Sequence, residues 1–144
     1  MDSTPGGHGW YARRVAERFD AIVIGAGQAG PALCGRLDKE GLKTALIERK
    51  LLGGTCVNNG CVPTKTMVAS AHAAHLARRG GDFGFAARTV RVDMAAVKRR
   101  KDHVVRQSTE GLKKWIGGMK HVSLVRGHAK FVGARRISVK GREL

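Results

Sequence analysis

The chain has 144 residues, a mass of 15.5 kDa and 42% hydrophobic residues, which suits one domain or a part of a larger protein. No apolar run approaches the roughly 20 residues that cross a bilayer, so we expect no membrane-spanning segment. The formal net charge is +16, and residues 88–144 hold 16 of the 27 basic but only 4 of the 11 acidic side chains. Such a charge attracts polyanions, but no aromatic-studded basic groove or helix-turn-helix spacing accompanies it, so we expect no nucleic-acid partner.

Cysteine usage and the N-terminus bear on the cellular compartment. Three cysteines are too few for the disulfide framework of a small secreted protein, and the first residues lack the basic and apolar regions of a signal peptide. We therefore expect a cytoplasmic, reducing location, where two neighbouring cysteines indicate redox chemistry or a metal. Residues 1–18 open with Gly and Pro and show no apolar period, so a flexible arm is expected there.

The next segment predicts a strand–helix–strand unit. Residues 19–24 form an apolar run typical of a buried parallel strand, and residues 31–40 form a helix that ends at Gly41. Residues 42–47 predict a second strand, which ends at Glu48. The connection between the two strands should be right-handed.

Two further helices and a ribbon are expected in the rest of the chain. Pro63 starts a helix that continues to Arg79, and Asp93 caps another that reaches about Ile116. Residues 121–125, 130–132 and 135–139 alternate in polarity around glycines, which predicts a small antiparallel ribbon. The expected fold class is α/β, with a Rossmann-like parallel sheet and this ribbon.

The first motif that carries chemistry is the string Gly25-Ala26-Gly27-Gln28-Ala29-Gly30. It is a G-x-G-x-x-G between a predicted strand and a predicted helix, where glycines allow a tight turn and close approach of a pyrophosphate. Glu48 ends the second strand, where a carboxylate can accept hydrogen bonds from an adenosine ribose. The alternative is a glycine-rich turn without a ligand.

The second motif is the string GGTCVNNGCVPTK, residues 53–65. Cys56 and Cys61 are separated by four residues, and the intervening Asn and Gly residues tolerate the turn that a disulfide would need. Cys61 is expected just before the helix that starts at Pro63, where the helix dipole favours a thiolate. This arrangement suits a reversible dithiol.

A zinc site is the competing interpretation of these cysteines. Cys56 and Cys61 together with His72 and His75 could supply two sulfurs and two imidazoles. The spacings depart from the usual zinc-finger pattern, because the cysteines are far apart and the histidines close together. We therefore expect no metal and interpret the histidines as ordinary helix residues.

The two motifs together resemble the class I pyridine-nucleotide disulfide oxidoreductases, a family that includes dihydrolipoamide dehydrogenase, glutathione reductase and mercuric reductase. The continuation Pro-Thr-Lys-Thr-Met is most similar to mercuric-reductase-like FAD-containing enzymes, and VRGHAKFVG resembles the ribbon near the adenine of FAD. The resemblance covers residues 19–144, which it identifies as the N-terminal part of an FAD/NAD(P)-binding domain with a redox disulfide.

The resemblance implies a role for each matching residue. Cys56 would be the thiol that attacks the substrate, and Cys61 the thiol beside the flavin ring. The residues implied in FAD binding are Gly25, Ala26, Gly27, Gly30, Glu48, Arg49, Gly53, Gly54, Thr55, Cys56, Lys65 and Ala129. NADPH or NADH would deliver electrons through FAD to the Cys56–Cys61 disulfide, which would reduce a small-molecule disulfide or Hg(II).

The length of the chain departs from the family pattern. Family members continue into a nicotinamide-binding domain and a dimerisation domain, so the sequence is expected to be a truncated portion of an enzyme that is a homodimer at full length. Two hypotheses follow: the FAD and redox-disulfide part of such an oxidoreductase, or a non-catalytic fragment whose basic surface binds polyanions.

Overall fold

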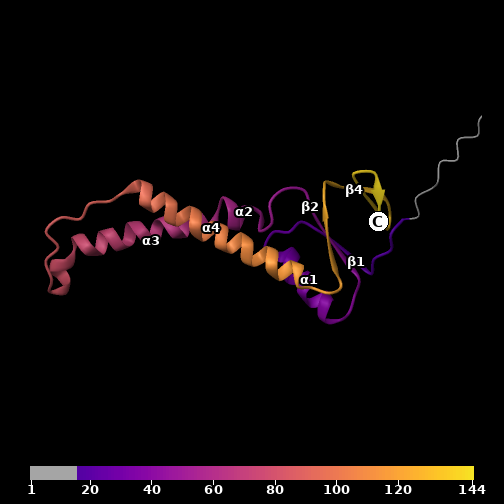
Figure 1. Cartoon of the computed structure of the whole chain (residues 1–144), viewed down its shortest axis with the longest axis horizontal. Helices are drawn as coiled ribbons and strands as arrows, with labels where there is room; N and C mark the ends of the chain where they lie inside the picture. The colour runs from indigo at the N-terminus through magenta and orange to yellow at the C-terminus, as the bar shows by residue number, and fades with distance from the viewer. Residues whose placement is uncertain (1–15) are drawn as a thin grey trace, which may run out of the picture.

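A computed structural model describes residues 16–144 of the chain. The arm expected at residues 1–18 therefore lies almost wholly outside the described residues. The described part combines a parallel sheet, a long helical hairpin and a small antiparallel sheet (Figure 1).

The parallel sheet has three strands, β1 (Ala21–Ile24), β2 (Thr44–Glu48) and β3 (Val122–Arg126), in the order β1-β2-β3. All five residues of β2 are buried, which explains its nearly continuous apolar sequence. Both pairings are parallel, with Ile24 beside Ile47 and Glu48 beside Arg126. The carboxyl ends of the strands therefore meet at one edge of the sheet.

Helix α1 (Ala29–Lys39) connects β1 to β2 and covers one face of the sheet. Its buried Cys34 packs with Leu46 of β2 and with Ile116 and Met119. The predicted strand–helix–strand unit is confirmed, although β1 and β2 each begin two residues later and α1 two residues earlier than expected. In the described part of the chain, no helix has the length and apolar character that a bilayer crossing needs.

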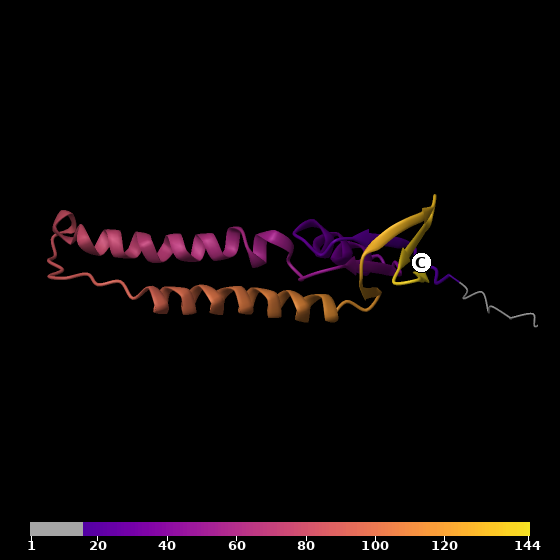
Figure 2. The same ribbon diagram turned by 90° about the horizontal axis from the view of Figure 1, so that it is seen from above.

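The long connection from β2 to β3 is almost entirely helical. It contains α2 (Gly54–Asn58), α3 (Cys61–Arg78), the 3-10 helix η1 (Gly80–Phe83) and α4 (Met94–Gly117). Helices α3 and α4 run side by side in opposite directions and project away from the sheets (Figure 2). The base of this hairpin therefore lies at the sheet edge, and its tip lies far from it.

The helix expected after Asp93 is confirmed. For the two helices near the cysteines, the prediction was partly wrong. Asp93 is the N-cap of α4, and its Oδ1 accepts hydrogen bonds from the amides of Ala95 (2.8 Å) and Ala96 (3.0 Å). Helix α2 was not predicted, because five residues are too few to show a helical period. Helix α3 begins at Cys61 rather than at Pro63, since Pro occupies a first-turn position where its missing N–H costs nothing.

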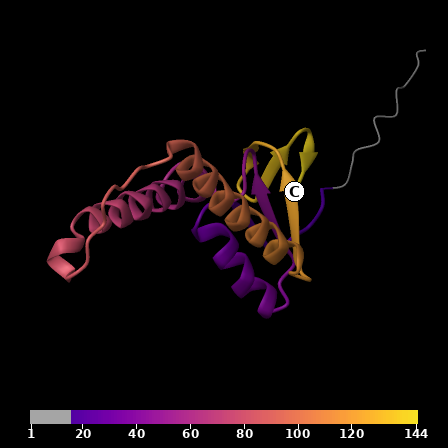
Figure 3. The ribbon, with the colours of Figure 1, turned by 60° about the vertical axis from the view of Figure 1, so that its left-hand side comes forward.

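The second sheet is antiparallel and consists of β4 (Ala129–Gly133), β5 (Arg136–Val139) and β6 (Arg142–Glu143). Ile137 and Val139 pack against Ala45 and Ile47 of β2. The antiparallel sheet thus covers the face of the parallel sheet opposite to α1 (Figure 3). The fold class is α/β, as predicted.

One part of the ribbon prediction is wrong. Residues 121–125 were expected in the antiparallel ribbon, but β3 joins the parallel sheet beside β2. The α3–α4 hairpin is the crossover that returns the chain in the same direction as β2. Alternating polarity predicts a strand with one covered face. It does not show whether this strand pairs with β2 in the parallel sheet or with the strands of the antiparallel ribbon.

Candidate functional site

The first part of the site is the loop between β1 and α1. Gly25 has a φ of +99°, and its amide donates to the carbonyl of Ile47 at 2.7 Å. A Cβ on Gly30 would lie 1.9 Å from the carbonyl oxygen of Gly25, so this position requires glycine. The space over Gly25 and Gly27 is open, and no side chain caps the start of α1. The helix amides are therefore available to an anion such as a pyrophosphate.

The second part is Glu48, which ends β2 with only 8% of its surface exposed. Its Oε2 accepts from the amide of Ala26 at 2.8 Å, and its Oε1 accepts from the amide of Lys50 at 2.6 Å. Burial raises the pKa of Glu48. The hydrogen bonds from the Lys50, Ala26 and Arg49 amides and the charge of Arg126 lower it by a larger amount, so the net shift is downward. An ionised carboxylate with spare acceptor capacity suits the hydroxyls of a ribose.

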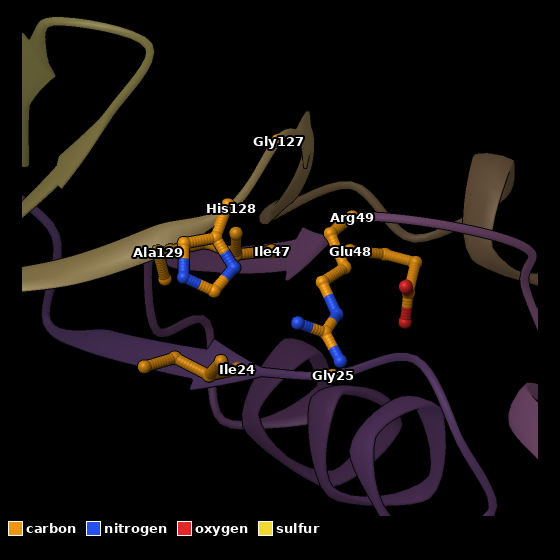
Figure 4. Close-up of a pocket in the computed structure, with 8 residues that line it drawn as sticks. All are labelled: Ile24, Gly25, Ile47, Glu48, Arg49, Gly127, His128 and Ala129. Carbon is orange, nitrogen blue, oxygen red and sulfur yellow. The ribbon is translucent and has the colours of Figure 1, made fainter.

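Glu48 and the glycine loop share a cavity of about 280 Å³ at the carboxyl ends of the strands (Figure 4). Its lining residues are Ile24, Gly25, Ile47, Glu48, Arg49, Gly127, His128 and Ala129. In Figure 4 the imidazole of His128 lies near Ala129 and Ile47, and the Arg49 guanidinium extends toward Gly25. The volume is close to the lower limit of about 300 Å³ for small-molecule pockets, so it suits one part of a dinucleotide.

Four predicted residues, namely Gly25, Glu48, Arg49 and Ala129, line this cavity. His128 and the apolar Ile24 and Ile47 were not among the predicted site residues, although they also line this cavity. Their positions in the sequence could have identified them. Ile24 is the last residue of β1, Ile47 is next to the end of β2, and His128 immediately precedes Ala129.

A second glycine-rich segment packs directly on the first. The amide of Gly53 donates to the carbonyl of Ala26 at 2.7 Å, and a Cβ on Gly54 would lie 3.0 Å from the Cα of Gly27. Gly53 and Gly54 both have positive φ values, +90° and +58°. The predicted residues Gly27, Gly53 and Gly54 are therefore adjacent in space, and Thr55 follows them in α2.

The cysteines lie immediately beyond this contact. Cys56 is in α2 and partly exposed, Cys61 is the first residue of α3 and exposed, and both are free thiols. The Cys61 thiol raises the pKa of Cys56 through a side-chain hydrogen bond, and desolvation raises it further, while the charge of Lys65 opposes the rise. Lys65 lies one helical turn beyond Cys61 in α3.

Asn58 stabilises the segment between the two cysteines. Its side-chain amide donates to the carbonyls of Leu52 (2.9 Å) and Gly54 (2.8 Å), which ties α2 to the preceding glycine-rich segment. The structure does not support the zinc interpretation. Within residues 16–144, no three His, Cys, Asp or Glu side chains lie close enough together to bind one metal ion. His72 and His75 instead lie along α3.

These observations fit FAD. The open surface over Gly25 and Gly27 with the uncapped helix start suits its pyrophosphate, and the ionised Glu48 suits its ribose. The cavity at Ala129 suits its adenine, and the segment that carries the cysteines directly follows the contact of Gly53 with Ala26.

Comparisons with known proteins agree with this assignment. The model of the family described as pyridine nucleotide-disulphide oxidoreductase matches residues 19–144. A dihydrolipoyl dehydrogenase of Chlamydia muridarum is 37% identical over 87% of this chain and 27% of its own length. A leghemoglobin reductase of Vigna unguiculata is 37% identical over 86% of this chain and 24% of its own.

Solved structures give the same result. The HOCl-induced flavoprotein disulfide reductase RclA of Escherichia coli superposes with a TM-score of 0.68 and 31% identity, over 86% of this chain and 25% of its own. The chain thus spans about a quarter of the length of these relatives. None of these relatives is named a mercuric reductase, so they do not support the predicted mercuric-reductase-like specificity.

Proposed function

We propose that this chain, which belongs to the pyridine nucleotide-disulphide oxidoreductase family, binds FAD and carries the redox cysteine pair of a flavoprotein disulfide reductase. The observation that carries this proposal is the direct contact between the two glycine-rich segments. Because Gly53 and Gly54 pack on Ala26 and Gly27, the dinucleotide loop and the Cys56–Cys61 segment form one continuous surface.

The protein groups divide the work between binding and chemistry. The loop around Gly25 and Gly27 would bind the pyrophosphate, and Glu48 would hold the ribose. Bound FAD would supply two-electron transfer between NADPH or NADH and the cysteine pair. The Cys56 thiolate would attack a substrate disulfide to give a mixed disulfide, and attack by Cys61 would release the reduced substrate and leave a Cys56–Cys61 disulfide.

The proposed substrate is a small-molecule disulfide. The named relatives support this class, since they include a dihydrolipoyl dehydrogenase and a disulfide reductase. Hg(II), which the Pro-Thr-Lys-Thr-Met continuation indicated, is the alternative acceptor. A cytoplasmic location remains a prediction.

A homodimer is part of the proposal for the full-length enzyme. The α3–α4 hairpin exposes Met67, Val68, Val92 and Met94, with between 43% and 60% of each residue accessible. Together with neighbouring side chains they line a mainly apolar groove of about 350 Å³. An apolar surface of this kind supports association with a second copy.

The experiment is a visible spectrum of the purified chain with FAD, before and after anaerobic two-electron reduction. We expect retained flavin and, after reduction, a long-wavelength thiolate-to-flavin band, because Cys61 would lie beside the flavin ring in the proposed arrangement. Cys61→Ser should retain FAD, lose the band and abolish disulfide turnover in the full-length enzyme. Cys34→Ala is the matched control, since Cys34 lies on the buried face of α1, and its replacement should leave the band intact.

Two outcomes would overturn the proposal. A chain that retains no flavin would lack the proposed site, and salt-dependent DNA binding by that chain would favour the alternative of a basic binding module. Retention of the band in Cys61→Ser would remove the assigned role of this thiol.

A further inference from the structure

Arg126 lies beside the residue that would hold the ribose. It ends β3, and the strand register places it next to Glu48 of β2. Its Nη1 donates to the carbonyl oxygen of Lys50 at 2.7 Å. The amide of the same Lys50 donates to Oε1 of Glu48 at 2.6 Å. One guanidinium group therefore holds the peptide segment that orients the carboxylate.

The other oxygen of the carboxylate is held independently. Oε2 of Glu48 accepts from the amide of Ala26, in the glycine loop. The orientation of Glu48 thus depends on one contact to the loop before α1 and on one contact to the segment after β2. The Arg126 hydrogen bond acts on the second contact, which lies in an irregular segment without strand pairing of its own.

The positive charge of Arg126 supports the Glu48 carboxylate in addition to the hydrogen bond that Arg126 makes to Lys50. It favours the ionised form of Glu48 and so contributes to the lowered pKa of this carboxyl. Arg49 and His128 line the same cavity, and Lys50 follows in the chain. Arg126 differs from these three groups because it both hydrogen-bonds the Lys50 carbonyl and lies in register with Glu48.

We infer that Arg126 is a positioning residue for FAD, which holds the Lys50 segment and through it keeps the Glu48 carboxylate oriented toward the adenosine ribose. The inference rests on the proposed function and deepens it. Arg126 itself is exposed, and its guanidinium bonds the segment after β2 rather than the core. Its replacement should therefore alter the site and leave the fold intact.

The test is a titration of the whole chain with FAD, and separately with AMP, for wild type, Arg126→Gln and Arg126→Lys. We expect Arg126→Gln to weaken both ligands about tenfold, the usual scale for losing one charge-assisted interaction. Arg126→Lys keeps the charge without the planar fork, so it should recover part of this loss. The matched control is Arg135→Gln, which removes the same charge from the exposed turn between β4 and β5.

The pH dependence separates positioning from a general structural effect. Glu48 must be ionised to accept hydrogen bonds from the ribose, and its pKa is lowered in the fold. Removal of Arg126 raises that pKa, so Arg126→Gln should lose AMP at a higher pH than wild type when the solution is acidified. Arg126→Lys and Arg135→Gln should follow the wild-type profile.

The outcomes distinguish the inference from the function on which it rests. A wild-type chain that binds neither FAD nor AMP would refute the proposed function and the inference with it. A wild-type chain that binds both, with Arg126→Gln indistinguishable from Arg135→Gln in affinity and pH profile, would refute the role of Arg126 alone.

Discussion

At the scale of single residues, Gly30 determines how closely α1 approaches β1. The absence of a side chain lets the helix pack against the carbonyl of Gly25, where a Cβ would lie only 1.9 Å away. The obstacle is backbone rather than the flexible end of a side chain, so the clash could be relieved only by moving the helix. The same movement would displace the amides that face the proposed pyrophosphate.

Gly30→Ala should therefore destabilise the fold by about 3 kcal/mol, the upper range for overpacking, and should weaken FAD binding. Urea unfolding followed by circular dichroism measures the first effect. Gly111→Ala is the control, because a Cβ there meets nothing within 4 Å on the exposed face of α4 and should stabilise the chain by about 1 kcal/mol. Equal stabilities of the two variants would contradict the packing argument.

At the scale of elements, α4 depends on its start. Asp93 satisfies two of the amides in the first turn that have no partner inside the helix. Asp93 also pairs with Arg99 at 3.6 Å, but both side chains are largely exposed and such pairs contribute little. The cap is therefore the main local contribution of this side chain, at the point where the hairpin turns back toward the sheet.

Asp93→Ala should lower the free energy of unfolding by about 1 kcal/mol. Asp93→Asn keeps an acceptor at the same position and should recover most of this loss, although it removes the pair with Arg99. Thermal unfolding of the three proteins gives the comparison. A loss in Asp93→Asn as large as that in Asp93→Ala would assign the stabilisation to charge instead of capping.

At the scale of the whole molecule, the two sheets and the hairpin differ in how they are stabilised. Buried clusters cover both faces of β2: one includes α1, and the other includes the antiparallel sheet. The distal part of the hairpin has α3 and α4 packed on each other, and its tip, residues 85–93, forms neither helix nor strand (Figure 2). Segments with few buried contacts and few backbone hydrogen bonds open more readily than a packed core.

Limited trypsin digestion should therefore cut first, within residues 16–144, after Arg88 or Arg91. Both arginines are exposed in the irregular tip, where a protease can bind the chain in an extended form. Mass spectrometry identifies the fragments, and the double variant Arg88→Gln, Arg91→Gln should remove the early cut. Initial cleavage at Arg126, inside the parallel sheet, would contradict this order of stability.

The sequence by itself determined the local parts of the protein. The strand at residues 21–24, the glycine loop and α1 follow from short-range rules: apolar continuity, glycine where the backbone turns, and a helix that ends before Gly41. Glu48 was predicted at the end of β2 by the same reasoning, and the family was identified from Cys56, Cys61 and the residues around them. Each of these features depends on neighbours within one motif.

Tertiary structure alone decided the features that join distant segments. The place of β3 in the parallel sheet depends on the crossover through α3 and α4, and the contact of Gly54 with Gly27 depends on the path of the loop after β2. The link from Arg126 through Lys50 to Glu48 spans 76 residues in its first step. Such pairings are invisible in local patterns, because their free energy comes from long-range packing that only the folded chain assembles.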